Sequence, residues 1–195
     1  MLLLVRHGVT EANREGRYLG RTDIALSAEG ERQVERLARW LPAADLIVSS
    51  PLRRARQTAA GLGGPVEIDE RWIELDYGPL ELEPVGSVSG ETYERWVTDP
   101  GFAPPGVETV AELAQRVMPA CEELVARAAS SVVAVVTHVS PVKVAVGWAL
   151  NTGAPLSGRL FVEDAGVSRV DIVDGRPVLR WFNRSGGTGP LADRV

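Results

Sequence analysis

Uninterrupted apolar runs alternate with amphipathic stretches along most of this chain. Residues 1–5 (MLLLV) and 132–136 (VVAVV) are continuously apolar, which is typical of strands buried on both faces of a parallel sheet. Residues 28–40 instead repeat apolar side chains at helical spacing and follow Ser27, a favourable N-cap. The alternation predicts an α/β fold, a three-layer α/β/α sandwich with an open, mainly parallel sheet.

The same patterns predict the remaining elements. We expect strands at residues 2–6, 45–50, 66–69, 132–137, 159–162, 166–173 and 178–182, and helices at 28–40, 52–61, 91–98, 107–129 and 141–150. Strands 2–6 and 132–137 are expected to be neighbours at the centre of the sheet. The turn Asp174-Gly175 predicts that the last two strands form a C-terminal antiparallel hairpin. Pro119 predicts a kink or a division in the long helix.

Turn signals and weak periodicity set residues 71–106 apart from the rest of the chain. We expect this segment to form a lid-like excursion over the site of a single domain, residues 1–184. The Gly-rich residues 185–195 are expected to be a flexible tail. The excursion carries four bulky side chains, Tyr77, Leu80, Tyr93 and Trp96. They either pack the lid onto the domain or favour a substrate with an apolar or ring portion.

Charge and composition exclude several classes of protein. The net charge is −5, so a general affinity for nucleic acid is not expected. No run of about 20 apolar residues is present, and such a run would be needed to cross a membrane. The single cysteine, Cys121, excludes a disulfide framework and a cysteine metal site. It agrees with a reducing cytoplasm, where we expect the protein as a monomer or homodimer.

Each of the two histidines follows a buried strand. His7 comes after LLLVR and His138 after VVAVVT, so the two imidazoles are expected to meet at the edge where parallel strands end. Arg6 can donate a bidentate pair to a phosphate, a neutral His7 can attack phosphorus, and Gly8 allows close approach of the backbone. The alternative for Arg6-His7-Gly8 alone is a strand end with an exposed arginine and a hydrogen-bonded histidine.

A second group of charges lies at the start of helix 52–61. Its three arginines cannot all face the same way, because successive helical residues turn by about 100°. Arg54 borders the stripe of apolar residues that should face the sheet and can reach the strand ends. Arg53 and Arg56 are expected to lie further round, toward water.

These residues resemble four motifs of the histidine phosphatase superfamily, the phosphoglycerate-mutase-like group. RHGVTEAN at residues 6–13 is similar to its signature RHGxTxxN. SSPLRRARQTA at 49–59 resembles its second motif, in which the arginine directly before alanine contacts phosphate, here Arg54. ELDYG at 74–78 resembles the acid motif, and VVTH at 135–138 resembles the last one.

Two positions depart from the family pattern. Val139 follows His138 where the family usually has glycine, and GVET at residues 106–109 replaces Gly-Glu-Ser. Neither change removes a group implied in catalysis, although Val139 is expected to reshape the substrate side of the pocket. The stretch THVSPVK at residues 137–143 resembles bacterial members related to α-ribazole phosphatases.

The resemblance implies a phosphomonoesterase that hydrolyses a small phosphorylated metabolite through a phosphohistidine on His7. Arg6, Arg54 and a cationic His138 would neutralise the phosphoryl oxygens, and Glu74 would protonate the leaving group. No metal and no cofactor are expected, because the arginines supply the positive charge. Substrate contacts are expected from Arg6, Thr10, Asn13, Gly20, Arg54 and Val139.

Several alternatives stay open at this point. Asp76 and Glu81 are rivals to Glu74 as the acid, unless they are surface carboxylates. A cofactor-dependent phosphoglycerate mutase would share all these residues, although the short segment 71–106 favours hydrolysis, because mutases carry insertions that shield the phosphohistidine. A non-catalytic phosphate-binding protein is less favoured, because all the expected groups are present. A dinucleotide-binding fold is excluded, because no GxGxxG follows the first strand.

Overall fold

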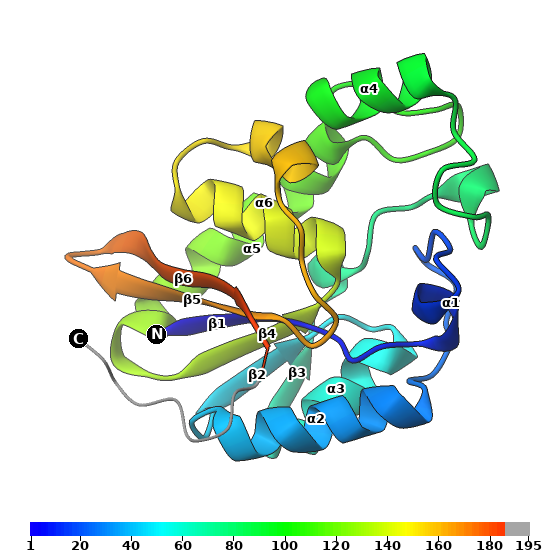
Figure 1. Cartoon of the computed structure of the whole chain (residues 1–195). Coiled ribbons are helices and arrows are strands. Elements are labelled where there is room, and N and C mark those ends of the chain that lie inside the picture. Colours follow the sequence, from blue (N-terminus) through cyan, green and yellow to red (C-terminus); the bar gives the residue numbers. More distant parts are fainter. Residues whose placement is uncertain (186–195) are drawn as a thin grey trace.

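The computed structural model describes residues 1–185 of the chain, apart from the side chains of residues 155–157. The tail expected at 185–195 therefore lies outside the described residues, except for Ser185. Six strands form one sheet in the order β3-β2-β4-β1-β5-β6 (Figure 1). The predicted α/β fold, with a mostly parallel sheet and a C-terminal antiparallel hairpin, is confirmed.

The centre of the sheet is parallel, as the apolar runs require. The strands are β1 (Leu2–Arg6), β2 (Leu46–Ser49), β3 (Val66–Ile68), β4 (Val133–Thr137), β5 (Val167–Val173) and β6 (Arg176–Arg184). β1 pairs with β4 in parallel and with β5 in antiparallel orientation, which confirms that the first apolar run and the fourth strand are neighbours. Every residue of β1, β2 and β4 is buried. Asp174 and Gly175 adopt φ of 51° and 75° in the hairpin turn between β5 and β6, as the Asp-Gly pair predicts.

Helices cover both faces of the sheet (Figure 1). The α-helices within the described residues are α1 (Glu11–Arg14), α2 (Ala28–Trp40), α3 (Arg53–Leu62), α4 (Gly90–Thr98), α5 (Val110–Ser130) and α6 (Val139–Ala149). Leu3 and Val5 of β1 pack with residues of α2 and α3, whereas Leu2 and Leu4 pack with residues of α5 and α6. This alternation follows from the opposite directions of successive strand side chains, and it produces the three layers. Among the described residues, no helix is long and apolar enough to cross a membrane.

The segment expected to be a lid lies beside the carboxyl ends of the strands. It contains two short 3₁₀ helices, η1 (Glu70–Trp72) and η2 (Gly78–Leu80), before α4, which stands away from the sheet in Figure 1. Tyr77 and Trp96 pack against Tyr18, with ring centroids 5.2 and 5.8 Å from the Tyr18 ring. These contacts favour the packing alternative for the two side chains, whereas Tyr93 is 44% exposed.

Two predicted elements differ most from the structure, whereas the other predicted bounds move by one or two residues, as where α6 begins at Val139 rather than at residue 141. Residues 159–162 are not a strand: the 3₁₀ helix η3 (Ala154–Arg159) ends there, and β5 already occupies the free edge of β1. The long helix begins at Val110 rather than at residue 107, because Thr109 caps it by a reciprocal bond with Glu112. It continues through Pro119 as one helix, so the division considered there is wrong.

Candidate active site

The two histidines meet at the carboxyl edge of the sheet. Arg6 and Thr137 are paired in the parallel register of β1 and β4, so the residues that follow them emerge side by side. The rings of His7 and His138 lie 5.0 Å apart between centroids, at an angle of 64°. Both side chains are buried. The structure thus brings together the two imidazoles that the sequence placed at separate strand ends.

The hydrogen bonds of His7 determine which of its nitrogens carries the proton. Nδ1 lies 2.7 Å from the carbonyl oxygen of Gly8, which can only accept, so Nδ1 is protonated. Nε2 then keeps its lone pair and accepts a 3.1 Å hydrogen bond from Nε of Arg54. Burial, and then the charges of Arg54 and Arg6, lower the pKa of His7 well below its usual value. The imidazole is neutral, with its unprotonated nitrogen directed at a cation.

Gly8 permits this arrangement through its lack of a side chain. A Cβ at this position would lie 2.7 Å from the carbonyl oxygen of Gly30, so α2 could not approach so closely. The Gly8 amide donates to the Thr58 hydroxyl at 3.1 Å, and that hydroxyl donates to the carbonyl of Arg54. The loop after β1 is thereby tied to α3.

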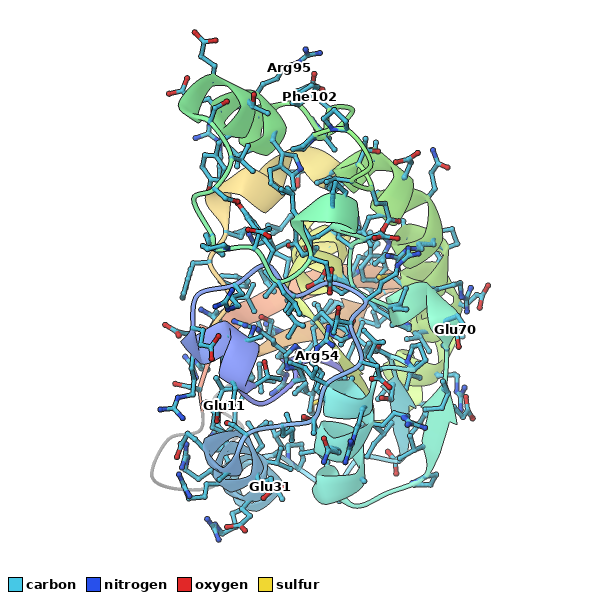
Figure 2. The ribbon with its side chains drawn as sticks, turned by 90° about the vertical axis from the view of Figure 1, so that its right-hand side faces the viewer. Glu11, Glu31, Arg54, Glu70, Arg95 and Phe102 are labelled. Atoms are coloured by element: carbon cyan, nitrogen blue, oxygen red, sulfur yellow. The ribbon has the colours of Figure 1, made fainter. Side chains whose placement is uncertain are left out.

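Arg54 is the buried arginine of the second motif. It is fully buried, whereas Arg53 and Arg56 are exposed, and Figure 2 shows it near the middle of the face at which the strands end. Its terminal nitrogens donate to the carbonyl oxygens of Gly20 and Thr22 at 2.6 and 2.8 Å. Burial lowers the pKa of Arg54 to about 10, so the side chain stays cationic at neutral pH.

Arg6 supplies a second buried cation. Its guanidinium donates to the carbonyl of Val162 at 2.6 Å and forms an ion pair with Asp164 at 2.5 Å. Its Nε has no hydrogen-bond partner within residues 1–185. The sequence reasoning did not identify Asp164, because its position depends on how the loop before β5 passes beside β1. The only signal available was an acidic residue shortly before a strand that pairs with β1.

His138 differs from the expected charge. Its Nε2 lies 2.7 Å from the Ser50 hydroxyl, and its Nδ1 is buried with no hydrogen-bond partner in the described part of the chain. Burial, followed by the charges of Arg54 and its neighbours, lowers the pKa of His138 well below its usual value. The cationic His138 that the sequence hypothesis invoked is therefore disfavoured next to two guanidinium groups when no anion is bound.

Glu74 is a buried carboxyl group between the excursion and α6. Its Oε1 accepts from the amide of Leu75 at 2.8 Å and from the amide of Ser140, in the first turn of α6, at 3.2 Å. Burial raises the pKa of Glu74, and these amides only partly oppose the shift. A carboxyl group with a raised pKa, close enough to Arg6 and Arg54 to act on their charges, suits proton donation.

The two rival carboxylates have other partners. Asp76 pairs with Arg21 at 3.2 Å and accepts from the amide of Gly78. Glu81 accepts from the amides of Gly20 and Thr22. These contacts hold loops in place and favour Glu74 as the acid. The contact with Glu81 also occupies the amide of Gly20, whose carbonyl oxygen accepts from Arg54.

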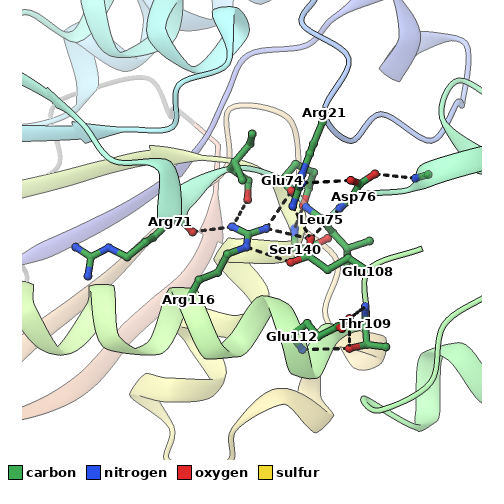
Figure 3. Close-up of polar contacts among 12 residues, drawn as sticks. Arg21, Arg71, Glu74, Leu75, Asp76, Glu108, Thr109, Glu112, Arg116 and Ser140 are labelled. Carbon is green, nitrogen blue, oxygen red and sulfur yellow. Dashed lines mark hydrogen bonds and ion pairs between the residues drawn. The ribbon is translucent and has the colours of Figure 1, made fainter. Parts of the chain in front are cut away.

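An arginine on α5 fixes the backbone around Glu74 (Figure 3). Arg116 donates to the carbonyl oxygens of Arg71, Ile73 and Glu74 at 2.7, 2.6 and 3.0 Å. Glu108 pairs with Arg116 at 3.1 Å and also accepts from the amide of Asp76. The sequence reasoning missed this pair. The available signal was a charged residue beside the inward-facing apolar positions of the long helix.

The remaining predicted contacts lie around this centre. Thr10 caps α1 by a reciprocal bond with Asn13, so both side chains have partners within the loop after His7. Val139 is half-buried at the first position of α6. Within residues 1–185, no group of three or more histidine, cysteine or acidic side chains is arranged to hold a metal ion.

Comparisons with known proteins agree with this geometry. The model of the histidine phosphatase superfamily (branch 1) matches residues 2–185. A bifunctional protein of Mycobacterium tuberculosis is 33% identical over 196 residues, which cover 95% of this chain and 54% of that protein. The chain thus spans about half the length of the first curated relatives that it matches.

Two other relatives match over more of their own length. Phosphoserine phosphatase 1 of Hydrogenobacter thermophilus is 35% identical over 152 residues, or 73% of this chain and 72% of that protein. A protein of Erwinia tasmaniensis named a probable phosphoglycerate mutase is 32% identical over 180 residues, or 86% and 83%.

Solved structures share the fold. Mycobacterial glucosyl-3-phosphoglycerate phosphatase in complex with VO3 superposes with a TM-score of 0.84 at 27% identity, and covers 94% of this chain and 99% of that one. A candidate α-ribazole-5'-P phosphatase of Escherichia coli has a TM-score of 0.82 at 27% identity, with 96% and 98% covered.

Proposed function

The chain belongs to the histidine phosphatase superfamily, and on that basis we propose that it is a phosphomonoesterase that hydrolyses a small phosphorylated metabolite through a phosphohistidine on His7. The observation that carries the proposal is the state of His7. Its Nδ1 donates to the carbonyl oxygen of Gly8 and its pKa is lowered, so Nε2 is unprotonated at neutral pH and accepts from Arg54. A neutral imidazole nitrogen oriented in this way is a competent nucleophile.

The first step forms the covalent enzyme. Nε2 of His7 attacks phosphorus, a P–N bond forms, and the bond between phosphorus and the ester oxygen breaks. Glu74 gives its proton to the departing oxygen, so the alcohol leaves neutral and Glu74 becomes a carboxylate. The raised pKa of Glu74 supports this role, because the proton must be present when the substrate binds.

The second step regenerates the enzyme. Water attacks phosphorus, the P–N bond breaks, and its electron pair returns to Nε2 of His7. The Glu74 carboxylate takes a proton from the water, which restores the acid for the next cycle. Inorganic phosphate is the second product.

The buried cations stabilise the charge that spreads over the phosphoryl oxygens. Arg54 and Arg6 are held by backbone carbonyls and by Asp164, so little reorganisation is needed as the transition state forms. Nδ1 of His138 has no hydrogen-bond partner among residues 1–185. It is proposed to gain a proton and to donate to the phosphate once the anion has entered the site. Thr10, Asn13, Gly20 and Val139 remain proposed substrate contacts.

The reaction is proposed to need neither a metal nor a cofactor, because Arg6 and Arg54 provide the positive charge. The test is release of inorganic phosphate from p-nitrophenyl phosphate in excess chelator, at saturating substrate. Turnover unchanged by the chelator supports the proposal. Activity that depends on an added divalent metal would contradict it.

A phosphoglycerate mutase is the second candidate, because relatives of similar identity carry that name. Hydrolysis is favoured by the relatives named phosphatases and by the short excursion between η1 and α5. The assay that separates the two candidates follows 3-phosphoglycerate with bisphosphoglycerate present. Release of phosphate supports the phosphatase, whereas formation of 2-phosphoglycerate without release of phosphate supports the mutase.

A further inference from the structure

A loop between η3 and β5, residues 162–166, contacts both the backbone and the side chain of Arg6. The Arg6 amide donates to the carbonyl oxygen of Gly166 at 2.9 Å. The guanidinium meets the same loop at the carbonyl oxygen of Val162 and at the carboxylate of Asp164. Figure 1 shows this segment passing beside the chain that leaves β1. The loop therefore holds Arg6 at both ends of the residue.

The backbone of this loop is fixed in a conformation that side chains rarely adopt. Ala165 has a φ of 55°, in the left-handed region, although it carries a Cβ. Such a residue persists only where its surroundings determine its conformation. Its amide donates to the carbonyl oxygen of His7 at 3.1 Å, and its side chain is buried in the cluster that contains Leu37 of α2. Asp164, directly before Ala165, is thus presented to Arg6 from a rigid backbone.

The two buried arginines of the site are held in different ways. Arg54 is held by the backbone carbonyls of Gly20 and Thr22, whereas Nη2 of Arg6 lies 2.5 Å from Oδ1 of Asp164. Burial lowers the pKa of Arg6, and the charge of Asp164 opposes this shift more than any other charge does.

The loop occupies only one side of the Arg6 guanidinium. Nη1 donates to the carbonyl oxygen of Val162 at 2.6 Å, and Nη2 is paired with Asp164. Nε is buried and has no hydrogen-bond partner within residues 1–185. Both terminal nitrogens are therefore anchored by the loop, and the Nε–H is left to donate to an oxygen of the phosphoryl group.

We propose that Asp164 is a positioning residue, which fixes the Arg6 guanidinium so that its Nε meets the transferred phosphoryl group. The inference rests on the proposed phosphatase activity and adds a residue on which the chemical step depends. Asp164 acts only through Arg6, because a carboxylate in contact with the phosphoryl oxygens would repel them.

The experiment measures kcat and KM for p-nitrophenyl phosphate in variants of Asp164. Asp164→Asn keeps the size of the side chain and removes its charge, so kcat is expected to fall about ten- to a hundredfold as the guanidinium loses its fixed place. KM is not expected to rise, because Arg6 stays cationic and a nearby negative charge is gone. Asp164→Glu is expected to restore most of kcat. The longer side chain has room, because Asp164 borders a cavity of about 310 Å³ that is also lined by Leu37 of α2.

Glu163→Gln is the matched control, because it removes an exposed carboxylate from the neighbouring position of the same loop. It is expected to leave kcat within about twofold of wild type, and thermal unfolding verifies that all variants fold. A double-mutant cycle tests whether Asp164 acts through Arg6. Asp164→Asn added to Arg6→Met is expected to cause no further loss of kcat, whereas a general loss of structure would add to the loss from Arg6→Met.

Three results would overturn the role of Asp164 and leave the phosphatase activity standing. They are a wild-type kcat in Asp164→Asn, an equal loss in Asp164→Asn and Asp164→Glu, and losses that add in the double variant. Absence of phosphate release by the wild type would reject the proposed function, and the inference with it.

Discussion

Nε of Arg54 donates to Nε2 of His7 over 3.1 Å, and this contact joins two segments that are 47 residues apart in the chain. The guanidinium therefore faces the same lone pair that would attack phosphorus. Arg54 remains cationic with a pKa of about 10, while the pKa of His7 is well below its usual value. The pair combines a nucleophile with a cation that is already in place for the developing negative charge.

The first prediction concerns the choice among the three arginines of α3. Arg54→Ala is expected to lower kcat/KM for p-nitrophenyl phosphate by about two to three decades, because a preorganised partner of the transition state is lost. Arg53→Ala and Arg56→Ala serve as controls on exposed neighbours, and are expected to stay within several-fold of wild type. If Arg53→Ala is the impaired variant and Arg54→Ala is not, the assignment of this motif is wrong by one residue.

The second prediction concerns the proton donor. Glu74→Gln keeps an oxygen for the Leu75 and Ser140 amides but has no acidic proton to give. Turnover of glycerol 3-phosphate is expected to fall by about 10²- to 10⁴-fold. p-Nitrophenolate leaves without help, so this variant is expected to release it in a rapid burst before slow turnover. Asp76→Asn and Glu81→Gln are the matched controls. If turnover of glycerol 3-phosphate falls in one of these variants and not in Glu74→Gln, the proton donor is that residue rather than Glu74.

The third prediction concerns Arg116, a positioning residue that acts through Glu74. Arg116→Met keeps the apolar stem but removes the donors to the three carbonyls around the acid. Turnover of glycerol 3-phosphate is expected to fall by about ten- to a hundredfold through misplacement of the carboxyl group. The p-nitrophenolate burst should change less, which a general loss of structure would not produce. Arg127→Met, on the same helix with the exposed partner Glu67, is the control, and equal losses in the two variants would refute the positioning role.

The fourth prediction concerns stability against pH. Burial and nearby arginines lower the pKa of His7 and His138 below 6.5, so the folded state stays neutral while the unfolded chain binds protons. The two histidines therefore make their full contribution to the free energy of unfolding above pH 6.5. The free energy of unfolding falls as the pH drops below this value. The expected slope of the free energy of unfolding is about 1.4 kcal/mol per pH unit for each histidine. Urea unfolding of the wild type and of His7→Gln measures it. A slope that the substitution leaves unchanged would show that His7 is protonated in the folded state.

The parallel core was predictable because its strands are buried on both faces. A residue in β1 or β4 must be apolar wherever it points, so the runs stand out in the sequence. Residues 159–162 carry a similar apolar signal, but no strand forms there, because β5 occupies the edge of β1. Which strand pairs with the edge of β1 depends on the topology of the whole sheet. The local pattern of apolar residues does not specify it.

The two histidines were predictable from spacing, because each follows a buried strand. Arg54 and Glu74 were assigned with the help of the family motifs, because the spacing of apolar residues does not fix the rotation of α3 to better than a residue and Glu74 lies in a segment of weak periodicity. Asp164 and Arg116 act through segments that meet only in the folded chain. The protonation of His138 could not be predicted either, because it depends on burial beside two arginines from different elements.

The measurement that tests the central claim most directly is the site of covalent phosphorylation. Glu74→Gln should accumulate the intermediate, because it lacks the base that activates water. Rapid quenching of this variant with a phosphomonoester, followed by peptide mass spectrometry under alkaline conditions, locates the phosphoryl group. The control is the same variant with His7→Asn added, which keeps Arg6, Arg54 and His138. The account predicts an acid-labile, alkali-stable phosphoryl group on His7 that the added substitution abolishes. A phosphoryl group on another residue, or wild-type turnover by the His7→Asn single variant, would contradict it.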